Sequence, residues 1–171
     1  ERLMGDGLWL NVGCSSLAVY GFENLDKISF PGVKRVDVRM GLPYSDGSVE
    51  LIVCSHMLEH LNVAFELPGV LREFYRVLRP GGLLRAAVPD LLVLAKCYAS
   101  NFEPLAKTQI GLAGIIGVPF EKLPPALQFS AICFGNYSKS VQYDGHHVCY
   151  DLEALSWVLG RAGFVDVRQV D

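Results

Sequence analysis

The sequence predicts an α/β fold built on a mostly parallel β-sheet with helices on both faces. Short apolar stretches alternate with turn signals through the first 90 residues. Several of these stretches are nearly continuous in apolar residues, which is typical of parallel strands covered on both sides. Two further segments carry the apolar periodicity of amphipathic helices, so strand and helix patterns share one chain.

Six segments have the composition of β-strands. Residues 8–13 (LWLNVG) and 49–55 (VELIVCS) are the clearest, because their apolar residues run almost without interruption. Residues 164–170 (FVDVRQV) instead alternate between apolar and polar residues, as a final strand would. The complete set is 8–13, 22–26, 33–38, 49–55, 83–89 and 164–170.

Two helices are expected, at residues 67–78 and 151–164. The first places its apolar residues on one stripe and ends at the stop signal RPGG. The second begins at Asp151, a residue type that caps helix N-termini well, and ends at Gly163.

The connections between the first strands are unusually short. Eight residues separate Gly13 from Phe22, and six separate Asp26 from Val33. Parallel crossovers usually need about a dozen residues or more, so the linking helices are expected to shrink to about one turn.

Residues 91–150 form the least regular part of a single domain that spans 1–171. They combine several prolines and glycines with many aromatic residues. We expect an insertion (cap) between the fifth strand and the last helix, lying over the strand ends, because long insertions in compact domains are usually functional. The alternative is a surface elaboration without function.

Composition narrows the class of protein. Hydrophobic residues make up 51% and charged residues 19%, as in a globular domain. The net charge of −3 argues against a broad nucleic-acid surface, and no apolar run reaches the roughly 18 residues of a membrane span. The five cysteines include no C-x-x-C pair, which favours a reduced, cytoplasmic setting.

Four segments together carry a resemblance to a known family. They are NVGCSS (11–16), LPYSDGSVELIVCSHMLEHL (42–61), LREFYRVLRPGGLLRAAVPDL (71–91) and YDGHHVCYDLEALSWVLGRAGF (143–164). With these motifs the chain resembles a class I S-adenosylmethionine-dependent methyltransferase. More narrowly, it is similar to the methyltransferase type 11, or predicted SAM-dependent methyltransferase, group of small bacterial proteins. The middle insertion matches that group poorly.

The resemblance implies a Rossmann-like fold and an enzyme of class EC 2.1.1.-. S-adenosyl-L-methionine would be its cofactor and S-adenosyl-L-homocysteine its product. The acceptor is expected to be a small molecule. A saccharide or other glycan-type compound is suggested only by the usual associations of the family, and not by residues of this chain.

The resemblance also implies that the loop after the first strand contacts the cofactor. Gly13 permits close backbone approach, and backbone N–H groups of the loop would hold the methionine carboxylate. The family commonly has V-G-C-G where this chain has a serine, and Ser15 excludes some glycine-only geometry. The expected contacts are Asn11, Gly13, Cys14 and Ser15.

Polar residues at the ends of later strands complete the implied cofactor site. Asp26 would accept hydrogen bonds from the two ribose hydroxyls, and Asp37 from the adenine amino group. The reverse assignment, with Asp37 on the ribose, stays open. Ser55 and His56 follow the fourth expected strand and would flank the sulfonium.

Three histidines are candidates for catalysis: His146, His147 and His56. Histidine can take a proton near neutral pH, which a hydroxyl acceptor would require. A family preference for one histidine shortly before the last helix selects His146 over His147, with Tyr143 and Asp144 as secondary candidates. Structural hydrogen bonding is the alternative role for the histidine pair.

No metal is expected. Residues 56–60 (HMLEH) match the H-x-x-E-H pattern of some metalloproteases, with His56 and His60 four residues apart. However, the sequence reveals no third ligand, and the family resemblance explains the same letters without a metal. His60 is expected to be a helix residue bonded to a backbone group.

Two rival functions remain open. One is a binding or interaction module that keeps the fold and has lost catalysis; the other is a hydrolase that uses Cys14. The family normally adds a seventh, antiparallel strand, for which no residues remain after 164–170. Either the chain is a truncated piece, that strand is disordered, or a partner supplies it. An unpaired edge there favours a homodimer.

Overall fold

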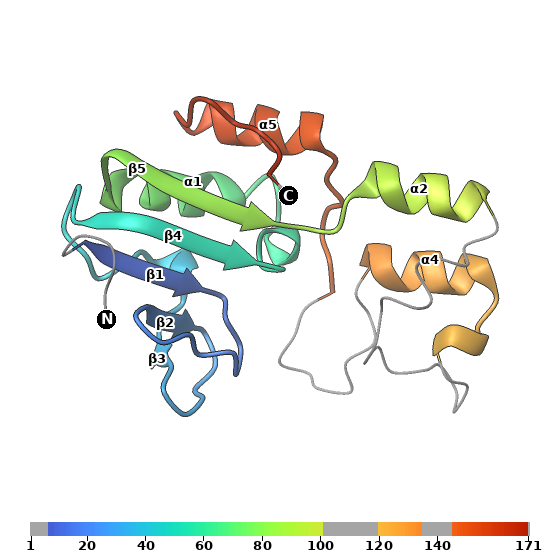
Figure 1. Cartoon of the computed structure of the whole chain (residues 1–171), viewed down its shortest axis with the longest axis horizontal. Coiled ribbons are helices and arrows are strands. Elements are labelled where there is room, and N and C mark those ends of the chain that lie inside the picture. Colours follow the sequence, from blue (N-terminus) through green and yellow to red (C-terminus); the bar gives the residue numbers. More distant parts are fainter. Residues whose placement is uncertain (1–6, 101–119, 135–144, 171) are drawn as a thin grey trace.

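The computed structural model describes residues 7–100, 120–134 and 145–170. Its centre is a five-stranded sheet in the order β3-β2-β1-β4-β5, and all four strand pairings are parallel (Figure 1). The strands are Leu8–Val12, Glu23–Asp26, Lys34–Arg35, Val49–Ser55 and Leu78–Ala87, numbered β1 to β5 in chain order. The predicted parallel α/β sheet is confirmed.

Two strands differ in length from the prediction. β3 keeps only two of the six residues expected at 33–38, because the chain turns at Asp37 into the short 3-10 helix η1 (Val38–Met40). β5 begins earlier than expected, directly after α1 (Leu67–Val77). Its register against β4 shifts between Val49 and Leu51, so RPGG is a bulge inside the ladder rather than a loop before it.

The short early crossovers are confirmed, and side-chain hydrogen bonds stand in for the missing helices. Asn24 lies buried in β2 and accepts the backbone N–H of Val19 at 2.8 Å. It also accepts from the amide of Asn11 in β1 at 2.9 Å. These bonds tie the 13–22 loop to both strands without a packed helix.

The main core lies between the sheet and the helices α1 and α5 (Leu152–Arg161). The α1 stripe predicted from periodicity is buried there, and Figure 1 shows α1 behind the sheet. The ring of Phe164, just after α5, meets Tyr75 of α1 edge-on at 5.5 Å between centroids. On the opposite face Leu83 is 66% exposed. Among the described residues, α1 and α5 pack into the same core on one side of the sheet.

The described part of the 91–150 insertion has a small core of its own. It contains α2 (Leu91–Ala99), the 3-10 helix η3 (Phe120–Lys122) and α4 (Pro125–Phe134). Leu94 of α2 is buried with Phe120, Ile132 and Cys133. Figure 1 shows α2 and α4 beyond the arrowheads of β4 and β5. A cap function for this insertion stays a prediction.

The final strand predicted at 164–170 is wrong. These residues have no strand conformation, Val165 is 81% exposed, and Asp166 has a φ of +53°. Alternation predicts a strand only if a neighbour completes its ladder, and none of the described strands pairs with this segment.

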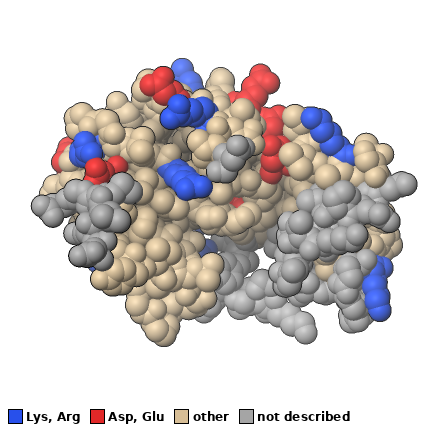
Figure 2. Space-filling view, viewed as in Figure 1, with Lys and Arg blue, Asp and Glu red and all other residues tan. Residues whose placement is uncertain are grey.

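The structure bears on two further expectations, that the chain has no membrane span and that it has no broad nucleic-acid surface. None of the described helices is both long and apolar enough for a membrane crossing. Figure 2 shows Lys and Arg interspersed with Asp and Glu on the visible face, rather than gathered into one basic stripe. The expected homodimer and cytoplasmic location stay predictions.

Candidate functional site

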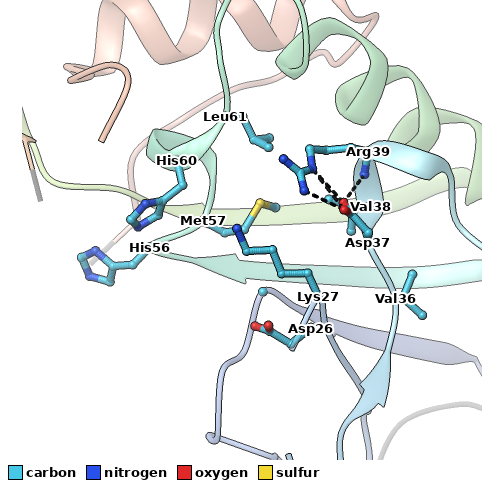
Figure 3. Close-up of a pocket in the computed structure, with 11 residues that line it drawn as sticks. Asp26, Lys27, Val36, Asp37, Val38, Arg39, His56, Met57, His60 and Leu61 are labelled. Atoms are coloured by element: carbon cyan, nitrogen blue, oxygen red, sulfur yellow. Dashed lines mark hydrogen bonds and ion pairs between the residues drawn. The ribbon is translucent and has the colours of Figure 1, made fainter. Parts of the chain in front are cut away.

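A pocket lies at the carboxyl ends of the parallel strands, where open α/β sheets bind ligands (Figure 3). Apolar side chains and charged groups share its wall. Its lining residues are Gly13, Asp26, Lys27, Val36, Asp37, Val38, Arg39, His56, Met57, His60 and Leu61. Four of the predicted site residues therefore converge here from four different strand ends: Gly13, Asp26, Asp37 and His56.

The loop after β1 requires a left-handed backbone at two positions. Gly13 has a φ of +67°, and a Cβ built there would lie 2.4 Å from Cγ of Met57. Ser15 has a φ of +50°, a conformation that favours glycine. Ser15 therefore adopts the glycine-like geometry that the family motif provides, at an energetic cost.

Asp26 organises this loop from the end of β2. One carboxylate oxygen accepts the backbone N–H of Ser15 at 2.8 Å, and the other accepts that of Ile28 at 2.9 Å. The Asp26 residue is buried, yet it still lines the pocket. The carboxylate thus joins the loops after β1 and β2 at the pocket wall.

Asp37 lies across the pocket in an ion pair. Its carboxylate caps η1 by accepting the backbone N–H of Arg39, and it pairs with the Arg39 guanidinium at 2.7 Å. The same guanidinium reaches Glu66 at 3.1 Å. The hydrogen bond from Arg39 lowers the pKa of Asp37, so this carboxylate is charged near neutral pH.

The remaining predicted cofactor contacts do not line the pocket. The Asn11 amide donates to the Leu17 carbonyl and to Asn24. This side chain therefore stabilises the 13–22 loop. Cys14 is buried, and burial together with Asp26 raises its thiol pKa. Ser55 ends β4 with an exposed side chain.

Of the three candidate histidines, His56 lines the pocket. Its side chain is 66% exposed, and its Nδ1 lies 3.1 Å from Oε1 of Glu59. That hydrogen bond raises the pKa of His56. Figure 3 shows the His56 and His60 rings next to each other at one end of the pocket.

His146 and His147 reach this region from the returning chain. The His147 backbone N–H donates to the Glu59 carbonyl at 2.7 Å. The His146 ring meets the His60 ring edge-on, with 4.7 Å between centroids. Burial, with a contribution from His60, lowers the pKa of His146. Tyr143 and Asp144 lie outside the described residues.

Several site residues were missed by the sequence interpretation. Lys27 and Arg39 line the pocket beside the two predicted acids, and a search for charged neighbours of those acids would have found them. Glu59 is the other omission, although it lies inside the quoted HMLEH motif. Its side chain is only 1% exposed, and the sequence alone does not reveal this burial.

Comparison with known proteins agrees with this geometry. A family model described as a methyltransferase domain matches residues 22–86. A probable S-adenosylmethionine-dependent methyltransferase from Mycolicibacterium smegmatis is 30% identical over 83 residues, which cover 46% of this chain and 31% of that protein. The matched region therefore spans about a third of that relative's length.

Solved structures share the fold at low sequence identity. A Thermotoga maritima SAM-dependent methyltransferase, described as a possible histamine N-methyltransferase, has a TM-score of 0.56 and 18% identity, covering 96% of this chain and 67% of that one. PigF, solved with SAH, has a TM-score of 0.50 and 18% identity, covering 96% and 46%. Residues 22–86 thus match a methyltransferase domain, and the described chain shares the fold of these solved methyltransferases.

Proposed function

We propose that this chain binds S-adenosyl-L-methionine in the pocket of Figure 3 and transfers its methyl group to a small-molecule or glycan-type acceptor. The observation that supports this most is the convergence of Gly13, Asp26 and Asp37 at the carboxyl ends of three neighbouring strands. The family match across residues 22–86 adds the reaction class.

The pocket residues suit the nucleoside part of the cofactor. Each Asp26 oxygen accepts one backbone N–H, which leaves lone pairs for two vicinal ribose hydroxyls. Asp37 is held as a charged acceptor for an amino group, which fits the adenine assignment. Val38, Met57 and Leu61 offer apolar surface for a base ring.

The methionine part needs a different arrangement from the one the resemblance implied. The backbone N–H groups of Gly13 and Cys14 donate to the Leu25 carbonyl, and that of Ser15 donates to Asp26. These donors are already used inside the chain. Lys27, which Figure 3 shows reaching across the pocket toward Met57, brings a positive charge to the same space.

A bound sulfonium would supply an electrophilic methyl group. The chain's contribution is to hold the acceptor in line with it, an effect of proximity that reaches several kcal/mol. An amine acceptor need only be unprotonated. A hydroxyl acceptor needs a proton acceptor, and His56 is the predicted histidine that lines the pocket, with His146 and His147 behind it.

A catalytically degenerate interaction module is the second candidate. The serine at position 15, where the family motif has glycine, favours it, because the residue departs from that motif and occupies a conformation that suits glycine. The hydrolase alternative has less support. Burial and Asp26 raise the pKa of Cys14, so its thiolate, the nucleophilic form, is disfavoured.

Calorimetric titration with S-adenosylhomocysteine tests the proposal. Wild-type protein should bind with a micromolar dissociation constant, and Asp26→Asn should weaken binding at least tenfold. Asp90→Asn is the matched control, since Asp90 caps α2 away from the pocket and should leave the affinity unchanged. Unchanged binding by Asp26→Asn would move the ribose role to Asp37. No binding by wild type would favour the interaction module.

A further inference from the structure

Three side chains that could ligate a metal ion meet at the edge of the pocket. They are Glu59 and His60 from the 3-10 helix η2 (Leu58–His60), and His146 from the returning chain. One potential ligand atom from each lies within 4.8 Å of the other two. The sequence showed the first two inside HMLEH, but the third is brought in only by the fold.

The burial of Glu59 points to a ligand. Its side chain is 1% exposed, and its Oε2 has no hydrogen-bond partner among the described residues. A buried, unpartnered carboxylate oxygen costs several kcal/mol of solvation unless a proton or cation compensates it. The other oxygen, Oε1, is held by His56 Nδ1 at 3.1 Å. One side of this carboxylate is therefore oriented, and the other is left for a cation.

His146 presents a second unsatisfied atom to the same place. Its Nδ1 is buried and lacks a hydrogen-bond partner among the described residues. The backbone bonds from His146 to Phe134 at 2.8 Å and from His147 to Glu59 at 2.7 Å fix this segment beside η2.

We propose that Glu59, His60 and His146 form a binding site for a divalent transition-metal ion, with zinc as the ion that suits them best. Two imidazoles and one carboxylate are a ligand set that zinc accepts with an open coordination position. Ligand atoms bonded to zinc at about 2.0–2.1 Å lie no more than about 4 Å apart, so binding requires only a small inward rotation of the side chains. His60 also lines the pocket, so the ion would adjoin the proposed methyl-transfer site.

This site gives His146 the role of a metal ligand instead of a general base. It also replaces the expectation that HMLEH binds no metal. His56, which the H-x-x-E-H pattern would have used, orients Glu59 and is not one of the three ligands.

Metal binding can be read directly on the full chain. Chelator-treated protein should bind one equivalent of Zn²⁺ in a calorimetric titration, and Co²⁺ should give a visible absorption spectrum. His146→Ala and Glu59→Gln should each weaken Zn²⁺ binding at least tenfold. His147→Ala is the matched control, because His147 is the adjacent residue and lies outside the cluster; its affinity should stay within about twofold of wild type. Circular dichroism melts check that each variant is folded.

Three results would overturn the site. One is no Zn²⁺ binding by wild type, and another is an equal loss in His147→Ala and His146→Ala. The third is a thiolate-to-cobalt charge-transfer band, which would show that a cysteine binds the metal. Cys54 would be a candidate, because its thiol interacts electrostatically with Glu59. The cobalt spectrum is recorded without cofactor, and the S-adenosylhomocysteine titration is done without metal. Either proposal can therefore fail while the other stands.

Discussion

The carboxylate of Asp26, at the end of β2, accepts the backbone N–H of Ser15, in the loop after β1, at 2.8 Å. Replacing Asp26 with Ala leaves that N–H and the Ile28 N–H without their acceptor, so we expect a stability loss of about 1–3 kcal/mol. Urea unfolding measures it. Asp37→Ala, at a more exposed carboxylate, should cost clearly less. Equal losses would contradict the organising role of Asp26.

Ser15 occupies a conformation that suits glycine. Its φ of +50° costs a residue with a Cβ about 1–2 kcal/mol. Ser15→Gly removes that cost but loosens the unfolded chain, so we expect a net gain of up to about 1 kcal/mol. Ser16→Gly, where φ is negative, should instead destabilise by about 0.5–1 kcal/mol. Thermal unfolding measures the stability of both variants. A loss of stability in Ser15→Gly would refute the claim that the positive φ of Ser15 is strained.

Gly13 should tolerate no side chain, for two separable reasons. Gly13→Ala adds backbone strain at a φ of +67° and a Cβ only 2.4 Å from Met57 Cγ. Gly21 has a φ of +86° but no atom within 4 Å of a built Cβ, so Gly21→Ala measures strain alone. We expect Gly13→Ala to exceed it by about 1–3 kcal/mol in urea unfolding. Similar losses would mean that Met57 moves aside freely.

Acid should weaken the contact between α1 and the loop before β4. A hydrogen bond from Arg76 lowers the pKa of Glu73 from 4.5 to about 2, and Glu73 also accepts the Leu42 backbone N–H at 2.9 Å. Because the folded pKa lies below the unfolded one, this stabilisation is complete above about pH 4.5 and is lost as the pH falls toward 2. Between about pH 4.5 and 2, the free energy of unfolding should therefore fall less steeply with decreasing pH in Glu73→Gln than in wild type. Chemical denaturation at several pH values measures this slope. The same slope in both proteins would count against the pair.

Phe74 anchors α1 against the sheet. It is fully buried in the main core, so Phe74→Ala should cost about 3–5 kcal/mol through lost burial and a residual cavity. Phe65 is 85% exposed, and Phe65→Ala should change stability by no more than about 0.5 kcal/mol. Chemical denaturation of this matched pair tests which phenylalanine the fold needs.

Much of the fold could be predicted because its signals are local. The apolar run of β4 and the stripe of α1 each reflect burial of one segment, and Asp151 caps α5 by accepting the Ala154 N–H at 2.8 Å as expected. The segment 164–170 could not be judged in the same way. Its alternation is local, but a strand exists only when a second segment completes the hydrogen-bond ladder.

The candidate site was predicted in part for the same reason. Gly13, Asp26 and Asp37 follow recognisable strand ends, and parallel strands bring those ends to one edge of the sheet. Asn11 does not line the pocket, because its amide bonds to Asn24 of the neighbouring strand, and the sequence does not reveal that contact.

The sequence by itself determined the parallel α/β architecture, the short early crossovers and the acids that line the pocket, since periodicity, turn residues and strand ends are properties of short segments. Only the tertiary structure decided that Glu59 is buried with one oxygen that lacks a hydrogen-bond partner among the described residues, and that His146 lies against His60. These facts depend on how the chain returns after the insertion to lie beside η2. Contacts between segments so far apart along the chain are set by packing and backbone hydrogen bonding, which no local pattern encodes.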